Sequence, residues 1–158
     1  MSKSKVIGVE EWSKQLDALG KEADGICKMA VYNGAKAVAD EVKAAIGTIP
    51  VYDPKTDRHP CGATAAEKAG LLSGMGIARM QSSGEGWDTT IGFDGYNSEK
   101  TEKYPKGHPN SMIARAINSG TSWLRKYPFI TRAFSSSKGA AEAAMAETIE
   151  TEVQRRLE

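Results

Sequence analysis

Residues able to bind a metal or to carry acid–base chemistry crowd one short segment of the sequence. Asp53, Asp57, His59 and Cys61 lie close together, whereas the second histidine, His108, is distant in sequence. No Cys-x-x-Cys or His-x-x-x-His pair is present, although zinc sites ordinarily use such closely spaced ligands. We therefore interpret the segment as a polar surface loop and expect no metal and no cofactor. A metal- or thiol-dependent enzyme built on His59, Cys61 and His108 is the alternative.

Neither cysteine has the sequence neighbours that nucleophilic catalysis needs. A reactive thiolate depends on a nearby base, an orienting group and a lowered thiol pKa. Cys27 lies between Ile26 and Lys28 in a predicted helix, where the role of a small packed apolar residue is typical. The glycines form no GxGxxG or GKS/GKT phosphate-binding sequence. The sequence therefore offers no catalytic constellation.

The segment 96–108 offers a different chemistry, because basic and aromatic residues alternate in it. Side chains of this kind track a nucleic-acid backbone, and here they are Tyr96, Lys100, Lys103, Tyr104, Lys106 and His108. Asp94, Glu99 and Glu102 dilute the positive field. A solvated loop is the simpler interpretation, and a DNA-associated binding module that uses this loop is kept as the alternative function.

Length and composition indicate what kind of protein carries these side chains. The chain has 158 residues, of which 40% are hydrophobic and 26% charged, as is typical of a folded domain. Its formal net charge of +1 argues against a strongly basic nucleic-acid module, so DNA can pass nearby without specific binding. No apolar run is long enough for a signal-peptide core or a membrane span, and we expect no membrane association. We predict a single domain over residues 1–158.

Apolar spacing predicts a long helical region from about Val9 to Ile46. Its apolar residues recur every three or four positions, first as Trp12, Leu16 and Leu19, and then as Ala35, Val38, Val42, Ala45 and Ile49. Gly20 and Gly25 lie between the two stretches and predict a break or a kink there.

A second long helix is predicted at the C-terminal end, where apolar residues recur every four positions as Ala141, Met145, Ile149, Val153 and Leu157. Serine is a preferred N-cap residue, so the serine run at 135–137 predicts the start of this helix. A shorter helix is predicted through Ile113, Ala116 and Ile117. Gly120 is expected to end it.

Between the helices, a short stretch alternates in the manner of a half-buried strand. Its apolar residues are Trp87, Ile91 and Phe93, and residues 76–81 form a plausible partner strand. The polar stretch 82–86 then predicts the turn of a β-hairpin. The period makes the core the expected place of Trp87, although a tryptophan can also stack on a ligand.

Two stretches without any period predict loops at about 47–70 and 94–110. The first contains three prolines and is longer than the roughly 12–15 residues beyond which unstructured loops become uncommon, so we expect a long flexible loop. Loops of this kind commonly reach a partner. Our candidate interface residues in the two loops are Tyr52, Asp53, Arg58, His59, Tyr96, Tyr104 and Lys106.

These elements together predict an α+β domain. We expect a small antiparallel sheet with a long N-terminal helix, a short helix and a C-terminal helix packed on it.

Several motifs, in order along the chain, resemble those of one protein family. Residues 113–122 resemble its A-x-x-x-E-x-G-T signature, 128–134 its P-x-P-F-L-R-P-A-L segment and 69–74 its T-G-x-L-x-x-S-I turn, while 33–39 resemble its N-terminal helix. The family is that of small neck or minor tail proteins of long-tailed phages with non-contractile tails, the gene-product-ten-like group. Asn118 stands where an acidic residue is common in that signature. Residues 51–68 look like an insertion.

The resemblance implies a structural virion protein of the neck or upper tail, and not an enzyme. Members of the family act in tail completion or head–tail joining, assemble as homo-oligomeric rings, and contact other tail or connector proteins. The resemblance places the protein in the virion, assembled in the host cytoplasm. It also implies a structural role for the family-motif residues, which are Gly70, Leu71, Gly120, Thr121, Pro128 and Phe129.

Overall fold

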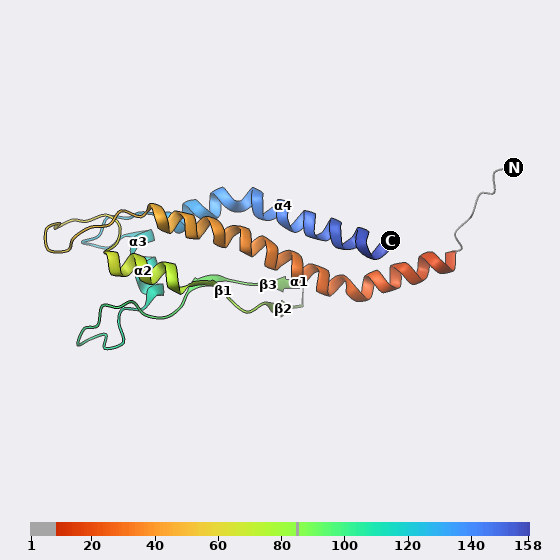
Figure 1. Cartoon of the computed structure of the whole chain (residues 1–158), viewed down its shortest axis with the longest axis horizontal. Coiled ribbons are helices and arrows are strands. Elements are labelled where there is room, and N and C mark those ends of the chain that lie inside the picture. Colours follow the sequence, from red (N-terminus) through yellow and green to blue (C-terminus); the bar gives the residue numbers. More distant parts are fainter. Residues whose placement is uncertain (1–8, 85) are drawn as a thin grey trace.

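Two long antiparallel helices and a group of short elements at one end make up the fold. The computed structural model describes residues 9–84 and 86–158. Helix α1 (Val9–Thr48) lies beside α4 (Phe129–Leu157), and the short helices α2 (Ala65–Gly74) and α3 (Asn110–Ser119) gather near the C-terminal end of α1 (Figure 1). The α+β class predicted from the sequence is confirmed, and α2 is an element that the sequence reading missed.

The predicted hairpin is confirmed, but it consists of two short ladders. Strand β1 (Met75–Ile77) pairs antiparallel with β4 (Ile91–Phe93), with Gly76 opposite Gly92. Strand β2 (Gln81–Ser83) pairs with β3 (Gly86–Asp88), with Ser82 opposite Trp87. Between the ladders, the Ala78 N–H donates to the Thr90 carbonyl oxygen at 2.7 Å, so the two ladders continue one hairpin.

Helix α1 is continuous through Gly20 and Gly25, so no break lies there, but its first part lies at an angle to the rest of the helix, in agreement with the predicted kink (Figure 1). Each glycine costs a helix only about 1 kcal/mol relative to alanine, which neighbouring contacts can offset. Two residues between the glycines make contacts of this kind with other elements. Glu22 forms an ion pair with Arg156 of α4, and Asp24 accepts a hydrogen bond from Trp87 Nε1 at 2.9 Å.

Helix α4 begins at Phe129, so the N-cap predicted at residues 135–137 is wrong. Pro128 stands at the cap position and its side chain makes no capping hydrogen bond. The cap comes instead from the end of α3, where Asn118 Oδ1 accepts from the N–H groups of Ile130 at 3.0 Å and Thr131 at 3.2 Å. Ser137, which was predicted to cap the helix, lies instead within α4 and is fully buried.

The face that α4 turns toward α1 differs from the predicted stripe. Ala141 is buried, but Ile149 and Leu157 are 42% and 38% exposed. In their place, Thr148 Oγ1 accepts a hydrogen bond from Asn33 Nδ2 of α1 at 2.9 Å, and Glu152 is buried. An α-helix has 3.6 residues per turn, so a stripe spaced every four residues drifts round the helix by about 40° per step.

Small residues line the contact between α1 and α4. Ala30, Ser137 and Ala141 are buried in it. A side chain at Gly34 would begin only 2.7 Å from Met145 Cγ, so the helices approach closely there. A contact made of small side chains buries little apolar area per residue, and the main apolar stabilisation therefore lies elsewhere.

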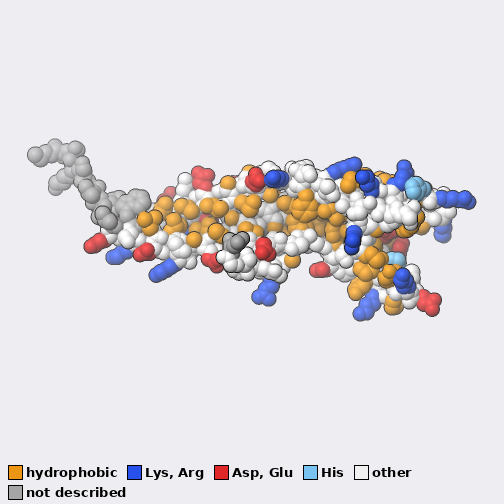
Figure 2. Space-filling model, turned by 180° about the vertical axis from the view of Figure 1, so that it is seen from behind, with side chains coloured by type: hydrophobic (Ala, Val, Ile, Leu, Met, Phe, Trp, Pro, Cys, Tyr) orange, Lys and Arg blue, Asp and Glu red, His pale blue; other side chains and the backbone are white. Residues whose placement is uncertain are grey.

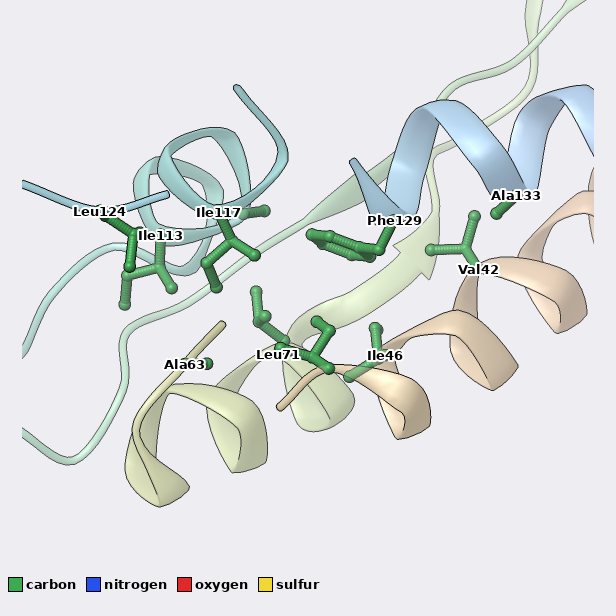
Figure 3. Packing of buried hydrophobic residues seen from close by; sticks show 11 residues of the cluster. Val42, Ile46, Ala63, Leu71, Ile113, Ile117, Leu124, Phe129 and Ala133 are labelled. Carbon is green, nitrogen blue, oxygen red and sulfur yellow. The ribbon is translucent and has the colours of Figure 1, made fainter. Parts of the chain in front are cut away.

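The apolar core lies where all four helices of the described chain meet. Its largest fully buried apolar side chains are Phe129, Ile46, Ile49, Leu71, Ile117 and Val42. Figure 3 shows Phe129 reaching from the first turn of α4 into the space between α1, α2 and α3. Phe93 of β4 packs edge-on against it, with ring centroids 6.3 Å apart.

The end of α1 is capped by side chains from distant segments. The last turn of α1 contains no basic residue. Lys68 of α2 supplies the cation, because its Nζ donates to the carbonyl oxygens of Gly47 at 2.9 Å and Ile49 at 3.0 Å. The Tyr127 hydroxyl donates to the Thr48 carbonyl oxygen at 3.2 Å. These bonds satisfy carbonyl groups that a helix end leaves without partners.

Replacing Phe129 by alanine tests the position of the core. Removing a fully buried phenylalanine typically costs about 3–5 kcal/mol, so we expect Phe129→Ala to lower the free energy of unfolding by that amount. Urea denaturation measures it. Phe134→Ala is the matched control, because Phe134 is 45% exposed on the same helix. Equal effects of the two substitutions would contradict the packing described.

A second pair of variants tests the cap of α4. Asn118→Ala removes the acceptor and should cost about 0.5–2 kcal/mol of stability, the usual range for a lost N-cap. Asn118→Asp keeps the acceptor and places a negative charge at the helix N-terminus, so it should be as stable as the natural protein or more so. Thermal melts of both variants check this, and an aspartate variant as unstable as the alanine variant would argue against the cap.

Candidate interaction site

The family-motif residues take part in packing, in backbone turns or in the start of a helix. Leu71 and Phe129 are core residues. Gly70 packs so closely on α3 that an added Cβ would lie 2.5 Å from Asn110 Oδ1. Gly120 has a φ of +78°, which glycine adopts without strain. Pro128 occupies the N-cap position of α4, as described above.

Thr121 shapes the turn after α3. Its Oγ1 accepts from the Leu124 N–H at 3.0 Å, and its own N–H donates to the Leu124 carbonyl oxygen at 2.9 Å. This compact turn buries Leu124 in the core and leaves the neighbouring Trp123 53% exposed. The turn therefore presents a large aromatic side chain to a partner or ligand.

The two predicted loops and this turn enclose a pocket at the end of the molecule. We call it the end pocket, and its volume is about 290 Å³. Its lining combines apolar, aromatic and acidic side chains from five segments, namely Tyr52, Pro54, Thr64, Glu67, Glu99, His108, Met112, Ile113, Ala116, Trp123 and Leu124. Tertiary folding therefore joins segments that are far apart in the sequence.

Thr64 connects Glu67 and Glu99 at the end pocket. Its Oγ1 accepts from the Glu67 N–H at 3.2 Å, which caps the N-terminus of α2. The same hydroxyl donates to Glu99 Oε1 at 3.2 Å. Glu67 comes from α2 and Glu99 from the loop 94–109, so this one hydroxyl joins the helix to the loop.

The electrostatic field of the end pocket is negative. Burial raises the pKa of Glu67 above its usual value, and the charge of Glu99 adds to this, while hydrogen bonds from Thr64 act in the opposite direction. Burial, followed by the charges of Glu67, Glu99 and Asp57, raises the pKa of Tyr52 to about 12. Burial, the main cause of both shifts, disfavours any charged form, and the smaller contributions from the neighbouring carboxylates give the pocket its negative character.

Asn97 fixes the loop that carries Glu99 and His108. Its Oδ1 accepts from the backbone N–H of Glu99 at 3.1 Å and from that of His108 at 2.8 Å. Its own N–H donates to the His108 carbonyl oxygen at 2.9 Å. Asn97 is buried, so both ends of the loop are tied through one internal side chain.

The loop predicted at 47–70 is shorter than expected, because α2 begins at Ala65. The missed signal is Thr64-x-x-Glu67, which has the pattern of a capping box before a helix. Backbone hydrogen bonds also tie the remaining loop to its surroundings. Ala63 N–H donates to the Pro50 carbonyl oxygen at 2.9 Å, and Arg125 N–H to that of Pro60 at 2.8 Å.

The candidate interface residues divide between the end pocket and the outer surface. Tyr52 lines the pocket, and the Tyr104 ring lies 4.6 Å from the ring of His108, which also lines it. The others lie on the exposed surface, namely Asp53, Arg58, His59, Tyr96 and Lys106. Asp53 orders its own turn, since its Oδ1 accepts from the Lys55 N–H at 2.9 Å.

Residues proposed for alternative chemistries are dispersed. Cys61 Sγ lies 3.9 Å from the Lys126 carbonyl oxygen, and Cys27, expected to be packed, is exposed on α1. Across residues 9–84 and 86–158, no three His, Cys, Asp or Glu side chains form a group that could hold a metal ion. Tyr104, a proposed stacking platform for DNA, instead contacts His108 and lies 5.5 Å from Lys103 Nζ.

The long helices also carry exposed apolar side chains, on more than one side of the helix pair. Together we call them the helix surface, and they are Leu16, Met29, Tyr32, Ile149 and Leu157, each at least 38% exposed. Figure 2 shows hydrophobic side chains following the two helices. Trp87, expected in the core, lies half-buried against α1, with Lys28 Nζ 4.9 Å from its ring centroid.

Comparisons with protein-family models, with curated proteins and with solved structures give no match to this chain. The described helices include none that is both long and apolar enough to cross a membrane.

The raised pKa of Glu67 predicts how stability depends on pH. Since its pKa is higher in the folded state, the folded protein binds more protons than the unfolded chain between the two values, and stability falls as pH rises through that window. Glu67→Gln should therefore raise the melting temperature at pH 8 and lose this advantage at pH 3.5. Glu102→Gln, at an exposed position, is the control. A Glu67→Gln variant that melts below the natural protein at pH 8 would refute the prediction.

Proposed function

We propose that this protein is a structural component of a phage virion, in the neck or upper tail. It acts in tail completion or head–tail joining by ring-like self-assembly and by contacts with neighbouring virion proteins. The observation that carries the proposal is the apolar helix surface, which folding within one chain leaves uncovered. The order of the family motifs supports the same role.

The first turns of α1 extend beyond their partner helix. At about 1.5 Å per residue, the 40 residues of α1 span about 60 Å and the 29 residues of α4 about 44 Å. Arg156 near the end of α4 pairs with Glu22, so the part of α1 before Glu22 projects past α4 (Figure 1). A single helix of fewer than about 12–15 residues is marginal in water, and packing on a neighbour would stabilise it.

The distribution of charge favours contacts between opposite ends of neighbouring copies. The helical end, residues 9–30 and 140–158, has ten acidic and five basic side chains. The loop end, residues 50–64, 95–108 and 120–128, has four acidic and seven basic side chains. Figure 2 shows Lys and Arg side chains gathered at the loop end. Like ends repel and unlike ends attract, which suits the head-to-tail contact that closes a ring.

Electron microscopy of particles from the parent phage with this gene interrupted tests the proposal. We expect filled heads together with separate or abnormal tails, and joined infectious particles when the intact gene is supplied from a plasmid. Normal infectious particles from the interrupted genome would overturn the proposal.

Complementation with variants tests the helix surface. Leu16 is 55% exposed on the projecting part of α1, so Leu16→Glu should leave the isolated fold intact, with a melting temperature close to the natural one, but fail to restore plaques. Gln15→Glu is the matched control, because it adds the same charge at a neighbouring exposed position without removing apolar surface. Full complementation by Leu16→Glu would exclude this surface from the assembly contact.

A further inference from the structure

We propose that the end pocket receives the Arg155 side chain of a second copy of this chain, so that neighbouring copies join head to tail. The inference rests on the proposed self-assembly, and it names the residues of one contact in it. It is carried by two features at opposite ends of the molecule. One is an acidic, aromatic pocket within a basic surface, and the other is an exposed arginine within an acidic surface.

The end pocket holds carboxylates that lack a cationic partner. Glu67 and Glu99 converge on it through Thr64, and neither forms an ion pair with any described residue. No lysine or arginine is among the side chains that line it. A buried or half-buried carboxylate is stabilised chiefly by pairing, so a positive charge from outside complements the pocket.

The remaining walls suit an arginine better than a metal ion. Calcium takes six to eight oxygen ligands, and the described residues contain no group that could hold a metal. Ile113, Ala116 and Leu124 offer an apolar wall for the methylene stem of a long side chain. Trp123 is half-exposed and lines the same pocket as the two carboxylates, and a planar guanidinium can stack on an aromatic ring while it pairs with a carboxylate.

Of the two arginines of the helical end, Arg155 is the one whose side chain is exposed enough to enter a pocket. Its side chain is 76% exposed, and its contact with Glu152 is long, at 3.8 Å. The neighbouring Arg156 is engaged by Glu22 and Glu152 instead. Leu157 beside it is 38% exposed and adds an apolar contact for the pocket rim.

The charges around Arg155 and around the end pocket are also complementary. Arg155 lies among Glu150, Glu152 and Glu158, whereas the end pocket is surrounded by exposed basic residues such as Lys100 and Arg125. Each end therefore carries an outer charge opposite to that of the other. Figure 1 places the C-terminal end of α4 and the loop end at opposite ends of the helix pair, so the contact requires two copies. Such a contact is heterologous, as ring formation demands.

Sedimentation velocity of the full chain tests the inference directly. We expect the natural protein to associate with increasing concentration at pH 8. Arg155→Glu and Glu99→Arg should each sediment as monomers. Arg155→Glu should keep the natural melting temperature, whereas Glu99→Arg loses the hydrogen bond from Thr64 and should melt somewhat lower while remaining folded. Lys138→Glu and Glu102→Arg are the matched controls, because they make the same charge changes at exposed positions on the same helix and the same loop. The controls should associate like the natural protein.

Mixing the two variants gives the decisive result. The Arg155→Glu variant keeps an intact pocket and the Glu99→Arg variant keeps Arg155, so the natural charge pair can form at one contact and the reversed charge pair attracts at the other. We expect the mixture to associate, whereas each variant alone remains monomeric. A mixture that stays monomeric while the natural protein associates would overturn the inference. So would single variants that associate normally.

A replacement variant and a limit on concentration cover the two cases in which the test above gives no association to compare. If Glu99→Arg does not fold, Trp123→Ala replaces it, because Trp123 is half-exposed and lines the same pocket. If the natural protein remains monomeric up to about 1 mM, the contact is too weak for assembly and the inference fails. A failure here, together with unjoined heads and tails in the interrupted phage, would leave the virion role standing and exclude only this contact.

Discussion

The whole structure depends on the apolar contact that Phe129 makes at the junction of the four described helices. Its ring is almost completely buried, together with Ile46, Leu71 and Ile117. Away from this junction, α1 and α4 meet through small side chains, and that seam supplies little hydrophobic stabilisation per residue. The long helix pair is therefore anchored at one end, while the other end projects into solvent. One end of the molecule is therefore tightly packed, whereas the other consists of helix that projects from its partner.

Hydrogen bonds between distant segments fix the helix ends and the loops around the apolar core. Asn118 caps α4, Lys68 caps the end of α1, and Thr64 caps α2 while it holds Glu99. Each of these side chains satisfies backbone or carboxylate groups of another segment, so the loops and helix ends are fixed by the same bonds. Asn97 does this within its own loop. The end pocket is a direct result, because its acidic lining residues are held by these bonds.

The two ends of the molecule are chemically unlike, and this gives a physical account of the proposed assembly. One end has a pocket with uncompensated carboxylates, and the other has Arg155 on a largely acidic helical surface. Surfaces that complement each other but not themselves favour head-to-tail contacts over symmetric pairs. The exposed apolar residues of the long helices, such as Leu16, provide the hydrophobic part of such a contact.

The sequence by itself determined the α+β class, the long helical regions and the hairpin, because local apolar periodicity specifies them. It did not determine that α1 passes through Gly20 and Gly25, or that α4 starts at Phe129, since contacts from Trp87, Arg156 and Asn118 decide both. The capping-box pattern at Thr64 could have predicted α2. No local sequence pattern could have predicted the end pocket. Its residues come from five segments, and only the burial of one shared core brings them together.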